Sequence, residues 1–400
     1  MQWIEGGITA AKGYKAAGEH LGIRKKPGKR DVALVVSETL ASAAGCYTQN
    51  LVKGAPLKVT KAHIANGKAQ AIICNSGNAN TCNDNGIEIA DGMSALVEQY
   101  TGINANDVIV ASTGVIGQPM TLAPFEEGMQ MLAAALDADG GHHAAKAIMT
   151  TDTVPKEVAV EFEMGGVICK LGGMAKGSGM IHPNMATMLC FLTTDAAIAP
   201  VALQDALSAV VTDTFNMLSV DGDTSTNDMV TVMANGMAGN AETADIAPFK
   251  TALQAVCEKL CRMMAKDGEG ATKLIACTVT GAKDESSAKA AAKAVICSSL
   301  VKSAFFGADA NWGRVLCAIG YSGAEVDVET VDIQFQSKAG LLSVCRQGRS
   351  IPFDEAVASD ILREDEIDIL VQCHDGDGKA TAWGCDLTYD YVRINGDYRT

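Results

Sequence analysis

The chain has 400 residues, of which 48% are hydrophobic and 20% are charged. This length exceeds one ordinary hydrophobic core, so the sequence predicts either two domains or one large multilayer sandwich. The 32 basic and 47 acidic residues give a net charge of −15, and the absence of a sustained basic stripe argues against nucleic acid or an anionic membrane as the main partner.

The N-terminal segment and the cysteines indicate a cytoplasmic protein. Residues 1–7 contain no cationic segment followed by an apolar run, and no later window approaches the ~20 apolar residues that span a bilayer. The 13 cysteines lie mostly in apolar runs, as expected for reduced thiols. Cys257 and Cys261 have helical spacing without an accompanying His, so they are interpreted as core residues rather than metal ligands. We therefore expect no disulfide and no metal site.

Short β-branched runs alternate with helical patterns along the chain, which is typical of an α/β protein. In the first half, the patterns predict an exposed basic turn at 24–30, strands at 31–37, 68–74 and 107–111, and a helix at 87–100. Gly165 and Gly166 separate two alternating runs, which predicts an antiparallel hairpin over 157–171. In the second half, the patterns predict strands at 187–192, 273–280, 313–319, 330–336, 368–373 and 388–394 and helices at 200–218, 247–266 and 285–303. No linker or internal repeat divides the chain, so we expect one globular unit.

Two glycine-rich segments imitate known ligand loops but depart from them at required positions. Residues 172–179 form a Gly-rich loop with a lysine, yet Lys176 is followed by glycine instead of the Ser or Thr of a phosphate-binding loop. Residues 221–227 begin like a calcium loop, yet the sixth position is Thr226 and the twelfth is Val232. Neither a nucleotide nor calcium is therefore expected.

Two further glycine-rich segments admit both a structural and a functional interpretation. Residues 267–273 carry Glu269 between a helix and a strand, where a helix C-cap is the ordinary explanation. Residues 112–117 follow a buried strand and either form a simple turn or present a hydroxyl and a backbone N–H to a substrate oxygen.

A polar loop leads directly into an apolar strand at Thr187. Thr at a strand start is most often only a β-former. Small residues on both sides also suit a peptide bond that is broken by the attack of the residue's own hydroxyl. If the bond between Ala186 and Thr187 is cleaved, Thr187 gains a free α-amine beside its hydroxyl, and this pair forms an activated nucleophile.

Several long motifs in order resemble the ornithine acetyltransferase (glutamate N-acetyltransferase) family over nearly the whole chain. They are residues 177–196, 113–114, 150–153, 219–228, 268–273 and 391–400. The opening segment 7–13 also resembles the family, although Ala11 stands where Pro is expected. The resemblance implies an α/β multilayer sandwich with two mixed or antiparallel sheets between helical layers. It also implies self-cleavage into an alpha chain, 1–186, and a beta chain, 187–400, that intertwine and assemble as two alpha plus two beta chains.

The resemblance implies a two-step acetyl transfer in arginine biosynthesis. The acetyl group passes from N2-acetylornithine to Thr187 and then to glutamate, which gives ornithine and N-acetylglutamate. The α-amine of Thr187 serves as the base, because an amino terminus titrates near ~7.7–8.0. His182 is interpreted as a structural residue of the cleavage loop. No cofactor is implied, and acetyl-CoA remains open as an additional donor.

Site residues follow from the same resemblance. It places the oxyanion hole at the Thr113 hydroxyl and the Gly114 N–H. It places substrate contacts at Thr150, Lys176, Thr187, Glu269, Asn395 and Thr400. Lys176 is expected to pair with a substrate α-carboxylate, and Glu269 with the ornithine ammonium. A frayed terminus is the structural alternative for Asn395 and Thr400, but the apolar and aromatic residues of the tail favour docking; they are Tyr389, Tyr391, Val392, Ile394 and Tyr398.

Two other functions compete with the transferase. A self-processing N-terminal-nucleophile aminopeptidase or amidohydrolase would release the acyl group to water. A non-catalytic metabolite-binding protein would leave the peptide bond before Thr187 uncut. Intact mass and an acetyl-transfer assay with and without glutamate distinguish the three.

Overall fold

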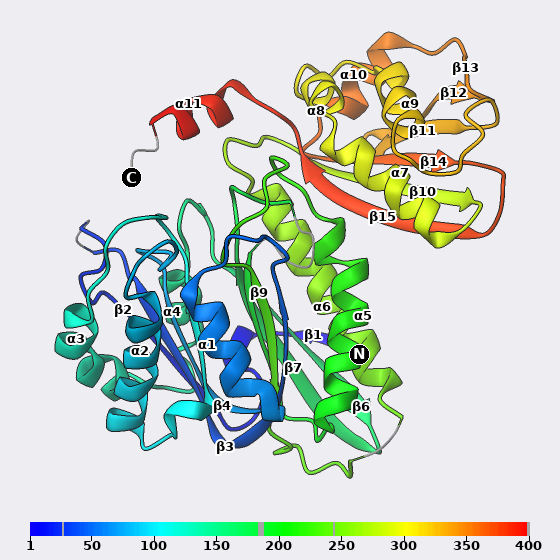
Figure 1. The fold of residues 1–400 in the computed structure, drawn as a ribbon. Coiled ribbons are helices and arrows are strands. Elements are labelled where there is room, and N and C mark those ends of the chain that lie inside the picture. The colour runs from blue at the N-terminus through cyan, green and yellow to red at the C-terminus, as the bar shows by residue number, and fades with distance from the viewer. Residues whose placement is uncertain (26–27, 183–187, 243–244, 398–400) are drawn as a thin grey trace.

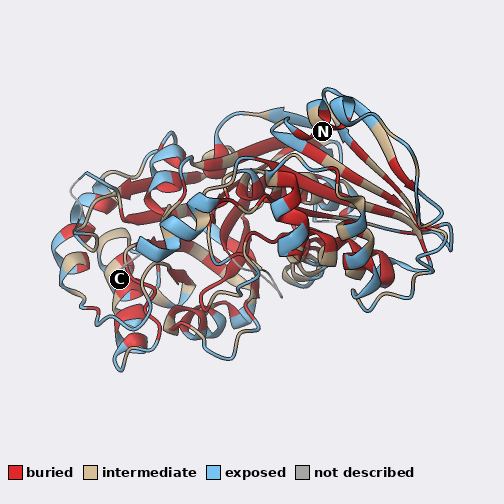
Figure 2. Cartoon of the chain, turned by 90° about the horizontal axis from the view of Figure 1, so that it is seen from above, coloured by how far each residue is buried: buried red, intermediate tan, exposed pale blue. Residues whose placement is uncertain are grey.

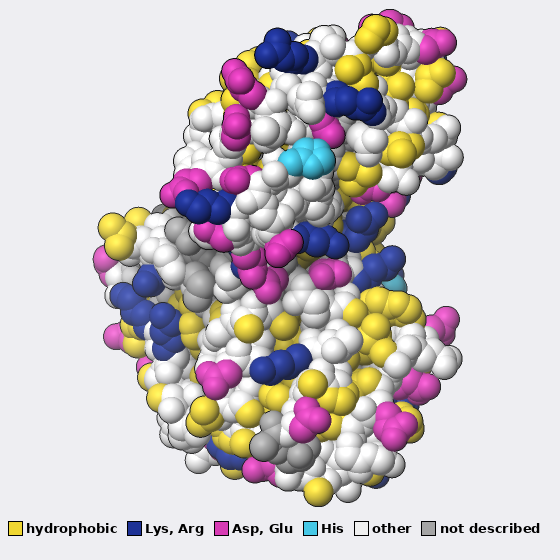
Figure 3. All heavy atoms as spheres, turned by 90° about the vertical axis from the view of Figure 1, so that its right-hand side faces the viewer, with side chains coloured by type: hydrophobic (Ala, Val, Ile, Leu, Met, Phe, Trp, Pro, Cys, Tyr) yellow, Lys and Arg dark blue, Asp and Glu magenta, His cyan; other side chains and the backbone are white. Residues whose placement is uncertain are grey.

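The computed structural model describes residues 1–25, 28–182, 188–242 and 245–397. A large lobe contains the N-terminal two thirds of the chain, and a smaller lobe contains most of the remainder (Figure 1). The space-filling view shows an indentation between the two lobes at the right-hand edge of the molecule (Figure 3). Within the described ranges, no helix is both long and apolar enough to cross a bilayer.

The two lobes contain two separate sheets. The strands are β1 (Gln2–Ile4), β2 (Tyr14–Glu19), β3 (Val32–Tyr47), β4 (Lys68–Asn75), β5 (Val108–Ser112), β6 (Lys156–Met164), β7 (Val167–Lys176), β8 (Leu189–Thr194), β9 (Met229–Ala234), β10 (Leu274–Ala282), β11 (Asp332–Ser337), β12 (Gly340–Arg346), β13 (Arg349–Ser350), β14 (Glu366–Gln372) and β15 (Gly378–Cys385). The first sheet has the order β1-β6-β7-β8-β9-β3-β4-β5 with β2 on β3, and the second has the order β13-β12-β11-β14-β10-β15.

Most of the described helices pack against these sheets. The helices are α1 (Ala55–His63), α2 (Gly86–Thr101), α3 (Ala123–Ala134), α4 (Gly141–Ala147), α5 (Pro200–Asp213), α6 (Ala247–Lys266), α7 (Glu285–Cys297), α8 (Ser299–Phe306), α9 (Trp312–Gly320), α10 (Glu355–Leu362) and α11 (Tyr389–Asp397). Short 3-10 turns lie at Gly7–Thr9, Ile64–Asn66, Ala105–Asp107 and Phe215–Met217.

The first sheet folds over on itself through the long strand β3. Its register shifts between Val36 and Ala41, and this irregularity lets one strand pair with β4 over its first part and with β9 over its last part. One apolar cluster lies between the two halves and joins residues such as Ile72 and Ile109 to Phe191 and Met233. The two halves are therefore stacked sheet layers.

Helical layers close both sides of this sandwich. One outer cluster joins α2 and α3 to β3, β4 and β5. The other cluster joins α5 and α6 to β6–β9 and continues into the second sheet without interruption. Figure 2 shows the corresponding bands of buried residues along the strands and on the inner faces of the helices. The predicted α/β sandwich with two sheet layers between helices is confirmed, and the two lobes share a continuous core.

Most predicted elements are confirmed, including the hairpin, which is β6 and β7. Two predictions are wrong in type: residues 313–319 lie in helix α9 and residues 388–394 lie largely in helix α11. The first five residues of the predicted loop 172–179 belong to strand β7. The helix predicted at 285–303 is interrupted at Ser298, whose side chain accepts a hydrogen bond from the Val301 N–H and caps α8. The helix predicted at 200–218 ends at Asp213.

Candidate active site

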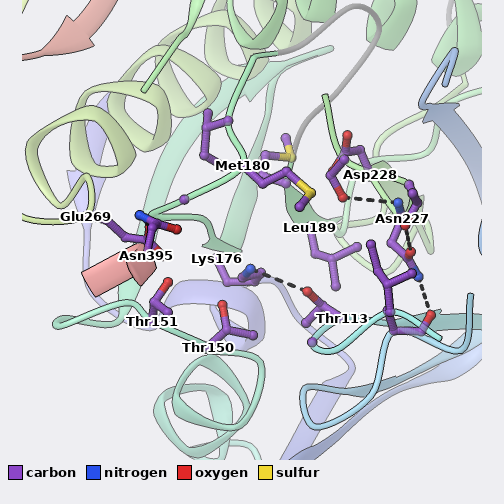
Figure 4. Close-up of a pocket in the computed structure, with 18 residues that line it drawn as sticks. Thr113, Thr150, Thr151, Lys176, Met180, Leu189, Asn227, Asp228, Glu269 and Asn395 are labelled. Carbon is purple, nitrogen blue, oxygen red and sulfur yellow. Dashed lines mark hydrogen bonds between the residues drawn. The ribbon is translucent and has the colours of Figure 1, made fainter. Parts of the chain in front are cut away.

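A pocket of about 150 Å³ opens where the end of β7 meets the starts of β8 and β9. It gathers six residues that the sequence analysis placed in the site: Thr113, Gly114, Thr150, Lys176, Glu269 and Asn395 (Figure 4). Ala186, Thr187 and Thr400, which complete the expected site, lie outside the described residues. Met188, the residue after Thr187 in the sequence, lines the pocket.

The loop after β5 holds Thr113 and Gly114 at the pocket wall. Asn75 at the end of β4 fixes this loop, because its carbonyl accepts a hydrogen bond from the Thr113 N–H at 2.9 Å. Gly114 has φ +128°, and a Cβ there would lie 2.8 Å from the Gly77 carbonyl carbon. Only glycine fits this position, both for its conformation and for its close approach to the neighbouring backbone. No described residue accepts a hydrogen bond from the Gly114 N–H.

Lys176 at the end of β7 donates a hydrogen bond to Thr113 Oγ1 at 3.4 Å (Figure 4). An ammonium group only donates, so this contact leaves the hydroxyl hydrogen of Thr113 available for another acceptor. Lys176 is 7% exposed. Burial lowers its pKa, while the carboxyl groups of Asp152 and Asp228 counteract this effect. The wall of the pocket thus combines a buried amine with a hydroxyl and a free backbone N–H.

A buried cluster of charged side chains lies next to the pocket and fixes two of its loops. Lys156 is fully buried, and its Nζ lies 2.6 Å from both Asp152 Oδ1 and Asp267 Oδ2. Asp152 also accepts hydrogen bonds from the Gly177 N–H at 2.7 Å and the Thr150 N–H at 2.9 Å. Burial raises the pKa of Asp152, but nearby lysines and these hydrogen bonds lower it to well below the usual range. The Asp152 carboxylate is therefore ionised, and it connects the loop at Thr150 with the loop at Gly177.

The C-terminal helix α11 contributes the outer rim of the pocket. Asn395 Nδ2 donates to Glu269 Oε2 at 2.8 Å. The backbone of Glu269 is held in position, because its N–H donates a hydrogen bond to the Ser178 carbonyl at 3.0 Å. The hydroxyl of Thr388, directly before α11, donates to the Gly270 carbonyl at 2.7 Å. These contacts join the C-terminal segment to the loop at 269–270, but α11 has no buried residue, and Tyr389 and Val392, two of the side chains expected to support docking, are exposed.

The loop that resembles a calcium site braces the segment leading to the expected cleavage position. Asp221 accepts hydrogen bonds from the Met180 N–H at 2.6 Å and the Ile181 N–H at 2.8 Å. Thr224 Oγ1 donates to the His182 carbonyl at 2.8 Å. Among the described residues, no cluster of His, Cys, Asp and Glu is arranged to hold a metal ion. The hydrogen bonds from Asp221 and Thr224 hold residues 180–182 in place.

His182 lies outside the pocket lining. Its Nδ1 is 3.1 Å from Ser219 Oγ and 3.5 Å from Cys297 Sγ. Burial and the charge of Lys293 lower its pKa to about 4, so the imidazole is neutral at physiological pH. These contacts agree with the structural role expected for His182.

Sequence reasoning missed two residues that line the pocket, Asn227 and Asp228, and the contacts of Arg24 outside it. Asn227 donates to the carbonyls of Ala79 at 2.5 Å and Ser112 at 2.9 Å, and so joins β9 to the loop that carries Thr113. Asp228 lines the pocket beside it. Arg24 donates to the carbonyls of Ser76, at 2.9 Å from Nε, and Met149, which corrects its interpretation as part of an exposed turn.

Asn227 and Asp228 belong to the motif 219–228 that carries the resemblance, and Asn227 also ends the calcium-like segment 221–227, but neither pattern assigned these residues a role in the pocket. Arg24 belongs to a basic run with Pro27 and Gly28, which is typical of surface turns.

Comparison with known proteins identifies the relatives of this chain. The ArgJ family model matches residues 15–400. Two relatives, each named arginine biosynthesis bifunctional protein ArgJ, come from Symbiobacterium thermophilum and Caldanaerobacter subterraneus; they are 52% and 49% identical, and each alignment covers 100% of both chains. A crystal structure of ornithine acetyltransferase complexed with ornithine, from Mycobacterium tuberculosis, is 35% identical over 46% of this chain and 99% of that chain, with a TM-score of 0.41. On the family match and the full-length identity, the chain belongs to the ArgJ family.

Proposed function

We propose that this protein is an acetyltransferase of arginine biosynthesis that moves an acetyl group from N2-acetylornithine to glutamate. The observation that carries the proposal is the gathering of six expected site residues in one pocket of a chain whose full-length relatives are named for arginine biosynthesis. The proposal includes cleavage between Ala186 and Thr187, so that Thr187 begins the chain 187–400.

The transfer proceeds in two balanced half-reactions. The Thr187 hydroxyl attacks the acetyl carbon of N2-acetylornithine, and its proton passes through the Thr187 α-amine to the nitrogen of ornithine, which leaves as a free amine. The amine of glutamate then attacks the acetyl ester. Its proton returns to Thr187 Oγ, and N-acetylglutamate is released.

The oxyanion of each tetrahedral intermediate lies against the loop at 113–114. Thr113 has a hydroxyl hydrogen that its contact with Lys176 leaves free, and no described residue takes the Gly114 N–H. Two preorganised donors of this kind stabilise developing negative charge in a water-poor site. The Lys176 ammonium adds positive charge next to one of them.

The polar rim of the pocket accounts for recognition of both amino acids. Lys176 binds the α-carboxylate that ornithine and glutamate share. Glu269, held by Asn395, binds the ammonium at the end of the ornithine side chain. Thr150, whose backbone N–H donates to Asp152, lines the same pocket and contributes a hydroxyl.

The proposal extends to acetyl-CoA as a second donor for glutamate and to an assembly of two alpha and two beta chains. An assay that supplies N2-acetylornithine with and without glutamate tests the transferase against the self-processing hydrolase. A transferase releases ornithine in stoichiometric amount with N-acetylglutamate and stops without glutamate. Continuous release of acetate without glutamate would instead identify a hydrolase.

A further inference from the structure

The Glu269 carboxylate lies in the space that a side chain at position 179 would fill. Gly179 and Glu269 both line the pocket. A Cβ added to Gly179 would have Glu269 Cδ and the two carboxyl oxygens as its three nearest atoms, each closer than 3.0 Å and therefore too close for a side-chain carbon. The observed position of this carboxylate thus requires a residue without a side chain at position 179.

Glycine at position 179 is required for space and not for backbone conformation. Gly179 is not among the glycines with positive φ, so alanine can adopt the same backbone conformation. Carbon atoms in ordinary contact are about 3.5–4.0 Å apart. An alanine at position 179 is therefore compatible with the backbone but not with the observed position of the Glu269 carboxylate.

The backbone around Gly179 is held by hydrogen bonds, so the carboxylate is the group that can move. The Ser178 carbonyl accepts a hydrogen bond from the Glu269 N–H at 3.0 Å. The Ser178 hydroxyl donates to the Asp267 carbonyl at 2.6 Å, and the N–H after Gly179 donates to Asp221 Oδ2 at 2.6 Å. These bonds fix the two loops against each other, whereas the carboxylate is at the end of a flexible side chain.

A hydrogen bond from α11 also fixes the carboxylate. Asn395 Nδ2 donates to Glu269 Oε2 at 2.8 Å, and Figure 4 shows the two side chains next to each other at the pocket. The start of α11 lies against the same loop, because a Cβ on Gly270 would lie 2.6 Å from the Tyr391 nitrogen. The Glu269 carboxylate is thus confined by the backbone of residue 179 and by the Asn395 amide.

The position of this carboxylate determines which side chain a bound amino acid can have. The described part of the pocket lining contains two carboxyl groups, those of Glu269 and Asp228. Asp228 is 2% exposed, whereas Glu269 is only partly buried, so Glu269 is the carboxylate that can reach the side-chain ammonium of a diamino acid. A hydrogen bond between these groups weakens steeply once the nitrogen–oxygen distance exceeds about 3.2 Å. A small displacement of the carboxylate is therefore sufficient to lose it.

We propose that Gly179 is a positioning residue that fixes the Glu269 carboxylate and thereby makes the pocket selective for a substrate with a side-chain ammonium. The role rests on the proposed acetyl transfer, in which ornithine carries this ammonium and glutamate does not. Gly179 acts through Glu269, so a side chain at position 179 should weaken the binding of ornithine and not that of an amino acid without the ammonium.

The test measures the binding of ornithine and of norvaline to wild type and to Gly179→Ala by isothermal titration calorimetry. Norvaline is ornithine without its terminal amino group, so the ratio of the two dissociation constants reports the ammonium contact. Gly320→Ala at the end of α9 is the matched control, because a Cβ there would meet nothing within 4 Å. Glu269→Gln removes the charge and keeps the shape of the side chain, so it shows the ratio expected without the ion pair.

We expect wild type and Gly320→Ala to bind ornithine roughly tenfold or more tightly than norvaline, as is typical of a hydrogen bond between charged groups. Gly179→Ala should lose most of this preference through weaker binding of ornithine. In the Glu269→Gln background, Gly179→Ala should not change the ratio further, because the displaced charge is already absent. In the steady state, Gly179→Ala should lower kcat/KM for N2-acetylornithine by a similar factor and leave kcat/KM for glutamate within about twofold.

An unchanged ratio in Gly179→Ala would overturn the role of Gly179, as would equal losses of affinity for ornithine and norvaline or a wild type without any preference. If Gly179→Ala does not fold or is not cleaved, the variant Gly179→Ala/Glu269→Ala decides. It should fold and be cleaved as well as Glu269→Ala alone, because the overlap is with the Glu269 side chain, and a poorer result would overturn the proposal. A wild type that transfers no acetyl group from N2-acetylornithine would instead refute the proposed function.

Discussion

Lys176 Nζ and Thr113 Oγ1 are joined by a hydrogen bond of 3.4 Å across the end of the sheet, although 63 positions separate them in the chain. The bond brings a buried cation to a hydroxyl without using the hydrogen of that hydroxyl. It therefore connects Lys176, which is expected to hold the substrate, with Thr113, which is expected to stabilise the transition state. Removal of one side chain should have a different kinetic effect from removal of the other.

Replacement of Thr113 by Ala should mainly lower kcat. The hydroxyl interacts with a charge that exists only in the tetrahedral state, so kcat should fall by roughly 10²–10³ while KM changes little. Steady-state kinetics of the cleaved protein measure this. Thr113→Ser keeps the hydroxyl and is the matched control. A cleaved Thr113→Ala variant with wild-type kcat would show that another donor binds the oxyanion.

Removal of the charge of Lys176 should instead weaken substrate binding. The α-carboxylate is present before and during the reaction, so Lys176→Met should raise KM for N2-acetylornithine and glutamate alike. Glu269→Gln should raise KM for N2-acetylornithine more than for glutamate, because only ornithine carries the terminal ammonium. Competition between the two substrates measures both effects. A selective effect of Lys176→Met on one substrate would contradict the shared role.

Gly114→Ala should abolish most activity, whereas Gly117→Ala should not. Both glycines have positive φ, +128° and +75°, so both substitutions carry a conformational cost. A Cβ at Gly114 would lie 2.8 Å from the Gly77 backbone, but a Cβ at Gly117 meets nothing within 4 Å. We expect a loss of about 10² or more in kcat for Gly114→Ala. Similar activities of the two variants would contradict the assigned backbone geometry.

Asp152→Asn should destabilise the protein at neutral pH. The variant loses one of the two carboxylates that pair with buried Lys156. A buried charge left without any partner costs about 3–5 kcal/mol, and the loss here should be smaller because Asp267 still pairs with Lys156. Because the folded-state pKa of Asp152 is depressed, its contribution is present above the unfolded pKa of about 3.9 and is lost as pH falls toward the folded value. The free energy of unfolding in urea should therefore be lower for Asp152→Asn than for wild type at neutral pH, and this difference should become smaller below about pH 4. Asp205→Asn, which is exposed, should leave the curve unchanged.

The sequence predicts the sandwich well but fails for two short apolar runs. Residues 313–319 were predicted as a strand because a short apolar run fits a strand or a buried helix equally. In α9 the buried residues Val315, Ala318 and Ile319 have helical spacing, and the side chain of Asn311 caps the first turn. Residues 388–394 were misassigned for a similar reason: their alternating aromatics suggested a strand, yet α11 has no buried residue.

The candidate site also contains residues that the sequence predicts and residues that only the structure shows. Thr113, Lys176 and Glu269 are found from motifs because the resemblance covers them. The motif 219–228 covers Asn227 and Asp228 as well, but the positions of these residues and of Arg24 are seen only in the structure, because they depend on carbonyl groups and strand ends that are distant in the sequence. Arg24 contacts the carbonyl of Met149, 125 positions away. No local pattern predicts such a contact.

The most direct test of the central claim is the intact mass of the purified protein before and after incubation with N2-acetylornithine alone. Two chains, 1–186 and 187–400, of roughly 19 and 22 kDa are expected from their lengths. Only the heavier chain should gain one acetyl group, and glutamate should remove it. Thr187→Ala should remain one uncut chain without any gain. An active protein that stays a single chain, or one that never gains an acetyl group on the heavier chain, would contradict this account.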